Sequence, residues 1–314
     1  MRFNKLDMNL LVALDALLHE LSISRAAERM NMSQSAMSSA LGRLRDYFDD
    51  ELLVQVGRKM ELTPRAEVLR DAVHDVLLRV DATVAARPEF DPAQSDREFR
   101  ILASDYTMAT LMPHALALAH RQSARARFML LPQVEDPQRA LERGEVDLLI
   151  MPRDYCAPDH PTEVLFTEEF VCVLWQGSAL AQGELTFERY AAAGHVVMQP
   201  HGTSQPSFEG WFVQRYGLAR RVEVTSYNFV SPPQLVVGTE RIATVHARLA
   251  HQLSRALPVV LRKPPFAMPA MQQALQWHKY RTKDPGIVWL RQVLHDAAQE
   301  MDRPQSEPTT APGG

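Results

Sequence analysis

Apolar residues in the first 48 positions recur every three or four residues and are interrupted by one short polar break, and this pattern constrains the fold more than any other feature. The spacing predicts amphipathic helices over 6–20 and 34–48, with a short helix over 25–30 between them. Ser22–Ser24 and Asn31–Ser33 supply capping and turn residues at the two boundaries. The apolar faces are Leu6, Leu10, Leu14, Leu17 and Leu18 in the first helix and Met37, Leu41, Leu44 and Phe48 in the last.

A hairpin and a long helix are predicted next. Two strand-like segments, 52–56 and 60–63, flank the basic turn Gly57-Arg58-Lys59, which predicts a β-hairpin of the kind called a wing. Pro64 suits the first position of a helix. The apolar residues that follow are typical of a dimerisation helix, although a helix packed only on its own chain remains the alternative. They are Ala66, Leu69, Val73, Val76, Val80 and Val84.

The polar residues of this region suit DNA. In a helix-turn-helix the second helix enters the major groove with its N-terminal residues against base edges, where glutamine pairs with adenine and arginine reaches guanine or phosphate. The formal charge of the chain is −4, but residues 34–45 carry two arginines and no acid. A polar helix with a solvated face is the alternative. The predicted DNA contacts are Gln34, Ser35, Ser38, Ser39, Arg43, Arg58 and Lys59.

From residue 97 onward, strand-like apolar runs alternate with helical runs, which predicts largely parallel α/β sheets. The strands fall into two groups, which predicts two lobes; they are 99–103, 128–131 and 146–151, then 169–175, 196–198, 221–224 and 242–245. The predicted domains are a winged helix-turn-helix over 1–65, a linker helix over 66–90, a two-lobed α/β domain over 91–303 and a disordered tail over 304–314.

Several segments resemble the LysR-type transcriptional regulators. In the DNA-binding half these are 6–11 (LDMNLL), 26–38 (AAERMNMSQSAMS), 41–45 (LGRLR) and 62–64 (LTP). The resemblance extends over nearly the whole chain to the NodD and NahR branch through 90–97 (FDPAQSDR), 143–152 (RGEVDLLIMP), 238–244 (GTERIAT) and 276–278 (QWH). Only the tail lies outside it.

The resemblance implies a winged helix-turn-helix, a dimerising linker helix and a periplasmic-binding-protein-like effector domain with two α/β lobes. It implies an activator that binds promoter DNA as a homodimer or homotetramer and works with RNA polymerase. Effectors in this branch are typically small aromatic molecules, such as flavonoids, salicylate-like acids, phenols and chlorophenols. The chain departs from the pattern at Ser35 and His246, where relatives usually or often have proline, so differences are expected at the start of the recognition helix and in the pocket or hinge.

Three segments are expected at the sensor cleft, because such clefts lie at the carboxyl ends of strands, near helix N-termini. Residues 104–107 follow a predicted strand, 201–204 precede the helix with Trp211, and 238–239 precede another strand. Hydroxyls there would orient a carboxylate or phenolate, and aromatic residues would form apolar walls; helix capping and core packing are the alternatives. The predicted ligand contacts are Ser104, Asp105, Tyr106, Thr107, Met151, His201, Thr203, Ser204, Phe229, Thr239, His246, Trp277 and His278.

Other classes of protein are not expected. No export signal and no apolar run of about 18 residues occurs, which favours a cytoplasmic chain without a membrane span. Cys156 and Cys172 are expected to be reduced thiols. Neither a metal site, a cofactor nor an enzyme is expected, since HExxH, GxSxG, P-loop and GxGxxG patterns are missing. The rival class, a small-molecule binding protein without a regulatory role, is disfavoured by the first 65 residues.

Overall fold

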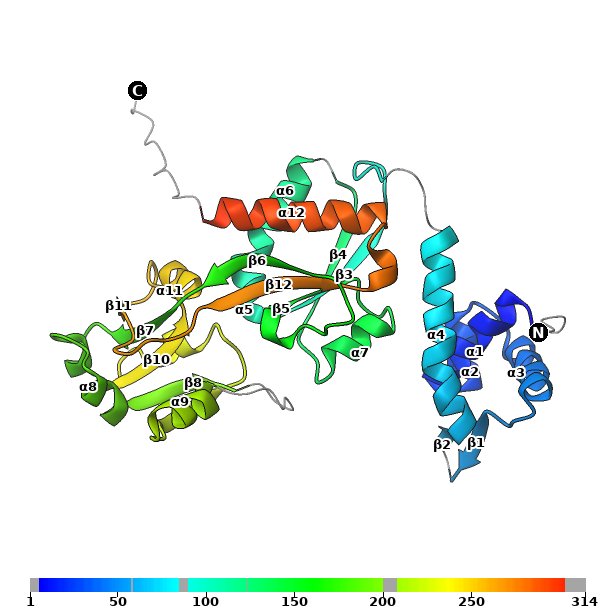
Figure 1. Ribbon diagram of the computed structural model, residues 1–314, viewed down its shortest axis with the longest axis horizontal. Helices are drawn as coiled ribbons and strands as arrows, with labels where there is room; N and C mark the ends of the chain where they lie inside the picture. The colour runs from blue at the N-terminus through cyan, green and yellow to red at the C-terminus, as the bar shows by residue number, and fades with distance from the viewer. Residues whose placement is uncertain (1–5, 58, 85–89, 123, 200–207, 303–314) are drawn as a thin grey trace. The chain divides into compact units, whose positions relative to one another are not determined.

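The computed structural model describes residues 6–57, 59–84, 90–122, 124–199 and 208–302 (Figure 1). The chain divides into two compact units, residues 1–87 with 142–144 and residues 88–141 with 145–314. In the described ranges, no helix is both long and apolar enough to cross a lipid bilayer.

In its described residues up to 84, the first unit contains four helices and a β-hairpin in the predicted order. Leu14, Leu17 and Leu44 are fully buried at the centre of its core. Asn31 has a φ of 52°, a left-handed conformation that asparagine tolerates better than most residues, and this permits the tight break between the second and third helices. The elements are α1 (Met8–Glu20), α2 (Ile23–Arg29), α3 (Gln34–Phe48), β1 (Leu53–Val56), β2 (Lys59–Leu62) and α4 (Pro64–Val84).

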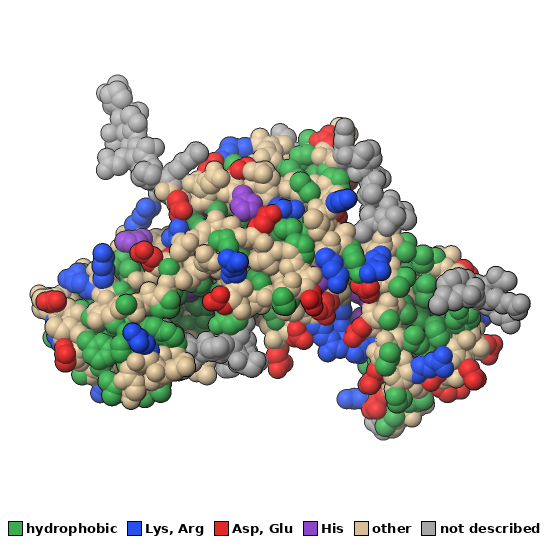
Figure 2. All heavy atoms as spheres, viewed as in Figure 1, with side chains coloured by type: hydrophobic (Ala, Val, Ile, Leu, Met, Phe, Trp, Pro, Cys, Tyr) green, Lys and Arg blue, Asp and Glu red, His purple; other side chains and the backbone are tan. Residues whose placement is uncertain are grey.

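The apolar residues of α4 lie on two surfaces. Ala66 and Val73 are buried in the core that α4 shares with α1. Val68 and Val76, by contrast, are 75% and 44% exposed, and Figure 2 shows hydrophobic side chains on the surface of this unit. The helix therefore packs on its own chain and also keeps apolar surface exposed.

The first lobe of the second unit is a five-stranded sheet of order β4-β3-β5-β12-β6. Strands β4, β3 and β5 are parallel, whereas β12 runs antiparallel to β5 and β6. Helices α6 and α12 pack together over a core that includes Phe99, Ile101 and Leu290 (Figure 1). The elements are β3 (Glu98–Ala103), α5 (Asp105–Thr110), α6 (Met112–Arg121), β4 (Arg127–Leu131), α7 (Pro137–Glu142), β5 (Leu148–Pro152), β6 (Thr162–Glu168), β12 (Met271–Trp277) and α12 (Pro285–Met301).

The second lobe is a five-stranded sheet of order β11-β7-β10-β8-β9. Strands β10, β8 and β9 are parallel, and β7 is antiparallel to its neighbours β10 and β11. Its main core surrounds Tyr190 and Phe212. The elements are β7 (Phe170–Trp175), α8 (Phe187–Ala192), β8 (Gly194–Met198), α9 (Phe208–Tyr216), β9 (Arg221–Ser226), α10 (Pro232–Leu235), β10 (Arg241–His246), α11 (Ala247–Leu253) and β11 (Val259–Arg262).

The prediction of largely parallel sheets was wrong, because in the described strands of each lobe only two of the four strand pairings are parallel and the other two are antiparallel. Three strands that the sequence pattern did not reveal, β6, β11 and β12, make antiparallel pairs. They arise because the chain crosses between the lobes twice, from β6 into β7 and from β11 into β12. After each crossing, the first strand in the new lobe, β7 or β12, runs antiparallel to the neighbouring strand of that sheet's parallel set.

Candidate functional site

The recognition helix α3 separates its residues cleanly between two faces. Met37, Leu41 and Leu44 are buried, while the five predicted DNA contacts on this helix are all exposed. Ser33 caps the helix, its Oγ accepting the N–H of Ala36 at 3.2 Å, and lies 3.0 Å from the Oγ of Ser35. The exposed set is Gln34, Ser35, Ser38, Ser39 and Arg43.

Two arginines of α3 have different environments. The Arg43 side chain is 58% exposed, and its guanidinium lies 3.5 Å from Asp7 in a surface ion pair, a kind of contact that contributes little to stability. Arg45, in contrast, donates to the carbonyl oxygens of Glu51 and Leu53 at 2.8 and 2.9 Å. Arg43 is therefore available to a partner, whereas Arg45 holds the β-hairpin against the helix.

The hairpin tip is partly described. Lys59, at the start of β2, is exposed opposite Val56. Arg58 lies outside the described residues. The base of the hairpin is held by Asp50, whose Oδ1 accepts from the Thr63 hydroxyl at 2.6 Å and from the N–H of Leu52 at 2.7 Å. These two hydrogen bonds, with the Thr63 contact as the larger cause, lower the pKa of Asp50.

The segment after β3 joins the two lobes. Ser104 caps α5 by accepting the N–H of Thr107 at 3.3 Å. The next residue, Asp105, accepts the backbone N–H groups of Phe229 and Val230, both at 2.9 Å, through one carboxylate oxygen. Because residues 229 and 230 follow β9 of the second lobe, Asp105 links the lobes instead of presenting both oxygens to a ligand.

Aromatic rings from both lobes meet beside this link. Tyr106 stacks on His246 with centroids 4.1 Å apart. Phe229 lies edge-on to both rings, with centroids 6.4 Å from Tyr106 and 4.9 Å from His246. Phe170 also lies near His246, with ring centroids 5.0 Å apart and planes inclined by 37°. The predicted residues 106, 229 and 246 are thus brought together, and Phe170 joins them.

Two nearly inaccessible polar atoms lie in this region without a partner in the described part of the chain. His246 is 4% exposed and its Nδ1 has no hydrogen-bond partner there; burial lowers the pKa of His246 to about 3, so the imidazole is neutral. Gln273 of β12 is 1% exposed, and its Nε2 donates to the Thr107 hydroxyl at 3.0 Å, while its Oε1 accepts from no described group. Unsatisfied buried polar atoms are uncommon.

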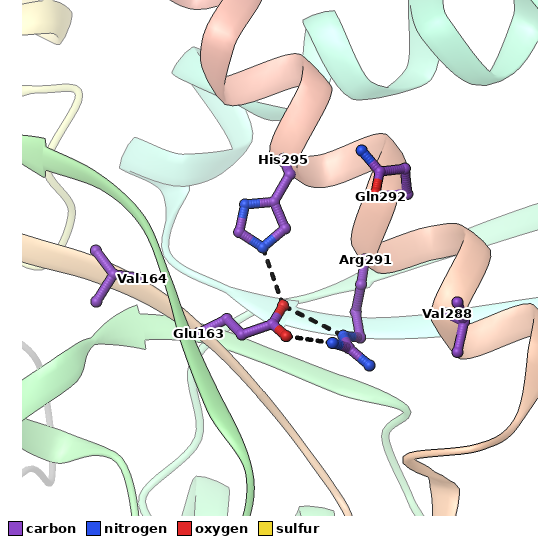
Figure 3. A pocket seen from close by; sticks show the side chains of 6 residues that line it. All are labelled: Glu163, Val164, Val288, Arg291, Gln292 and His295. Carbon is purple, nitrogen blue, oxygen red and sulfur yellow. Dashed lines mark hydrogen bonds and ion pairs between the residues drawn. The ribbon is translucent and has the colours of Figure 1, made fainter.

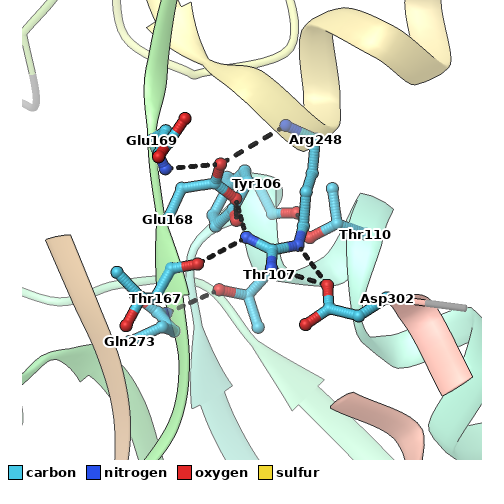
Figure 4. Close-up of polar contacts among 9 residues, drawn as sticks. All are labelled: Tyr106, Thr107, Thr110, Thr167, Glu168, Glu169, Arg248, Gln273 and Asp302. Atoms are coloured by element: carbon cyan, nitrogen blue, oxygen red, sulfur yellow. Dashed lines mark hydrogen bonds and ion pairs between the residues drawn. The ribbon is translucent and has the colours of Figure 1, made fainter. Parts of the chain in front are cut away.

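A buried ion pair lies next to the aromatic cluster (Figure 4). Glu168, at the end of β6, is 0% exposed and accepts from the Tyr106 hydroxyl and from Arg248 of α11, the latter at 3.0 Å. Arg248 also donates to Asp302 at 2.6 Å. Burial, followed by the charge of Glu168, raises the pKa of Tyr106. The sequence pattern did not reveal Glu168 or Arg248, which come from segments 80 residues apart.

Four predicted ligand contacts lie elsewhere. Thr239 precedes β10 and bonds the Val236 carbonyl at 2.8 Å, so it lies at the end of the strand opposite His246. Trp277 pairs with Leu148, the first residue of β5, because β12 is antiparallel; it and His278 therefore lie at the sheet end away from Ser104. Met151 is buried in the core beside α7.

The predicted contacts His201, Thr203 and Ser204 lie outside the described residues.

One surface hollow of about 350 Å³ lies between β6 and α12 (Figure 3). Its charged groups pair with one another: Glu163 accepts from Arg291 and from His295, the latter at 2.9 Å. These contacts lower the pKa of Glu163 against the effect of burial. Because the charged groups are mutually paired, the hollow is less suited to a small polar ligand than the cluster around His246.

Comparisons with known proteins cover both units. Residues 8–67 match the model of the bacterial regulatory helix-turn-helix proteins of the lysR family, and residues 92–299 match the LysR substrate binding domain. Nodulation protein D of Bradyrhizobium sp. (strain ANU 289) is 40% identical over 99% of this chain and 92% of its own length. Nodulation protein D 2 of Rhizobium leguminosarum bv. phaseoli is 42% identical over 96% of this chain and 95% of its own.

Solved structures agree with the fold. A probable transcriptional regulator from Pseudomonas aeruginosa is 29% identical with a TM-score of 0.64, covering 94% of this chain and 98% of that one. A full-length OxyR variant from the same organism, 18% identical, has a TM-score of 0.70 over 96% of this chain and 98% of its own. The chain therefore belongs to the LysR family of bacterial DNA-binding transcription regulators.

Proposed function

We propose that the chain activates transcription in response to a small aromatic inducer that binds between the lobes of the second unit. The observation that carries this proposal is the cluster of Tyr106, Phe229 and His246, together with Gln273, whose Nε2 donates to the adjacent Thr107 and whose Oε1 accepts from no described group. Aromatic faces favour a flat ring, and an amide oxygen accepts from a phenolic hydroxyl. Phenols, chlorophenols, salicylates and flavonoids all combine these two features.

The DNA-binding half acts through the exposed face of α3. Two copies of α4 pair through apolar residues such as Val68 and Val76, so that two recognition helices meet the half-sites of one dyad. Gln34 and Arg43 contact base edges or phosphates, and Lys59 contacts the backbone at the hairpin. A homodimer or homotetramer of this kind recruits RNA polymerase at the promoter.

Inducer binding shifts the population between two arrangements of the lobes. Asp105 and the Tyr106–His246 stack join the lobes directly, so a ligand placed against them favours one arrangement only if it binds that arrangement more tightly. The response is therefore limited by the difference between the two affinities. The proposed role is binding alone, and purified protein is expected not to turn over candidate aromatics.

The test is thermal stabilisation of the purified full chain by a panel of phenols, chlorophenols, salicylates and flavonoids, since a ligand that binds the folded state raises its melting temperature. A compound that stabilises the wild type is then compared on Gln273→Leu, which lacks the amide, and on Gln292→Leu, a matched change in the hollow by α12. The compound is expected to lose its stabilising effect in Gln273→Leu and to keep it in Gln292→Leu.

The same compound is then added to protein bound to promoter DNA. A change in DNA affinity or bending is expected. If no aromatic compound stabilises the protein, or if a stabilising compound leaves both DNA properties unchanged, the proposed inducer response is wrong.

A further inference from the structure

Three metal-ligating side chains meet between α1 and α4 of the first unit. Asp15 and His19 are one helical turn apart on α1, and His74 comes from α4. The Nδ1 atom of His74 lies 2.7 Å from Oδ1 of Asp15, and the Nδ1 atom of His19 lies 3.2 Å from the same oxygen. Their side chains are only 9–13% exposed. One donor atom from each residue lies within 4.8 Å of those of the other two.

The spacing of these donors is close to that of a metal site. Zn²⁺ binds histidine nitrogen and carboxylate oxygen at about 2.0–2.2 Å, which places tetrahedral donor atoms about 3.3 Å apart. The contacts of 2.7 and 3.2 Å already approach that separation. Three protein ligands would leave a fourth position for water, which is a common arrangement for zinc.

The contacts of the two rings show which nitrogens would hold a metal. Neither Nε2 atom has a hydrogen-bond partner in the part of the chain that the structure describes. Nδ1 of His19 also lies 2.8 Å from the backbone oxygen of Asp15, so a metal held by the two Nδ1 atoms and the carboxylate would replace that contact. Each ring therefore has one nitrogen engaged with Asp15 and one nitrogen that no described group uses.

Two arginines lie near the three side chains: Arg29 approaches the carboxylate, and the charge of Arg143 acts on His19. The nearest positive group that contacts the carboxylate is Arg29, 3.8 Å from Oδ2 of Asp15, and its side chain is 47% exposed. Arg29 also lies 3.6 Å from Glu20, so a second acid is available to hold the guanidinium.

We propose that Asp15, His19 and His74 form a divalent transition-metal site of the Zn²⁺ type, which joins the first helix of the DNA-binding motif to the linker helix. This reverses the expectation from the sequence that the chain holds no metal site. The imidazole ligands favour Zn²⁺ and Co²⁺ over Mg²⁺. Occupation of the site ties α4 to α1 and so fixes the helix that carries the exposed Val68 and Val76 relative to the recognition motif.

The experiment uses the full-length protein, stripped with a chelator and titrated with Co²⁺ while its visible absorption is recorded. One Co²⁺ per chain is expected, with the intense bands of a tetrahedral site, and displacement by Zn²⁺ but not by Mg²⁺. His74→Gln removes one ligand, and His120→Gln is the matched control at an exposed histidine of α6. Since loss of even an outer partner of a metal ligand costs about 10- to 100-fold in affinity, His74→Gln is expected to weaken binding by about 100-fold.

Should His74→Gln fail to fold, X-ray absorption at the zinc edge of the wild type provides the second measurement. Two imidazole nitrogens and a carboxylate oxygen in the first coordination sphere support the proposal. An all-oxygen sphere, or Co²⁺ binding that is equal in His74→Gln and His120→Gln, overturns it. So does a wild type that binds no Co²⁺, because the three side chains would then form only a hydrogen-bonded contact between two helices.

Discussion

Tyr106 and His246 stack with their ring centroids 4.1 Å apart and their planes inclined by 22°, although they belong to different lobes. Tyr106 lies in the first turn of α5, directly after β3, and His246 ends β10. The contact places His246 at the junction of the lobes.

Stability is predicted to fall as the pH is lowered from 6.5 because of His246. The folded pKa of His246 is about 3, below the ordinary histidine value of 6.5, so the unfolded chain binds the extra proton first. The stabilisation present above pH 6.5 is therefore lost as the pH falls toward 3. His246→Phe keeps an aromatic ring but removes this titration. Urea unfolding of His246→Phe at several pH values is expected to show that the free energy of unfolding changes less steeply with pH, by up to about 1.4 kcal/mol per pH unit.

The control is His251→Phe, at an exposed position, which should leave this pH dependence unchanged. An unchanged pH dependence in His246→Phe would contradict the prediction.

Asp105→Asn is predicted to destabilise the second unit by about 1–3 kcal/mol, because the carboxylate accepts two backbone N–H groups in charge-assisted hydrogen bonds. Thermal unfolding provides the measurement. Asp159→Asn, at an exposed position, serves as the control and should change stability little. Equal melting temperatures for the two variants would show that the Asp105 link contributes nothing.

Glu168→Gln is predicted to destabilise the protein by about 1–3 kcal/mol, because Glu168 is buried and accepts from Arg248 and the Tyr106 hydroxyl, whereas Arg248 keeps its contact with Asp302. The matched control is Glu300→Gln, which removes the more exposed ion pair with Arg121 and should cost less than about 1 kcal/mol. Chemical denaturation compares the two. A smaller loss for Glu168→Gln than for Glu300→Gln would be the contrary result.

Arg43→Ala and Arg45→Ala are predicted to separate DNA binding from stability. Arg43→Ala should weaken DNA binding by about 1–3 kcal/mol if it reads a base and leave the melting temperature unchanged. Arg45→Ala removes two bonds to hairpin carbonyls and should lower the melting temperature. Fluorescence anisotropy with DNA selected from a random pool, together with thermal unfolding, distinguishes them. Normal DNA affinity in Arg43→Ala would remove this residue from the interface.

The helical parts of the fold were predictable because their residues repeat at regular intervals. The stripe of leucines in α1 and the capping residue Ser33 of α3 give local signals that need no distant partner. In β12, however, Gln273 and Gln276 are both nearly inaccessible and make the strand look polar. Gln276 is satisfied by the carbonyl oxygen of Ala157 and the hydroxyl of Thr162, which are more than 110 residues away in the chain.

The candidate sites were also predictable only where a local sequence signal marks them. The exposed face of α3 follows from helical periodicity, and Ser104–Thr107 follow a recognisable strand. Thr239 precedes its strand, as expected, but this is the end of β10 away from His246, and no strand was predicted around Trp277, which lies in the antiparallel strand β12. The pairing of His74 with Asp15 spans 59 residues; only the spacing of Asp15 and His19 by four residues offered a local signal.

The order of the strands also bears on how the protein forms during translation. Residues 170–262 supply all five strands of the second lobe in one continuous stretch, whereas the first lobe needs β12 between β5 and β6. The ribosome therefore delivers a complete second sheet while the first still lacks an inner strand. A nascent chain that stops near residue 262 would leave the facing edges of β5 and β6 unpaired, and such edges invite aggregation.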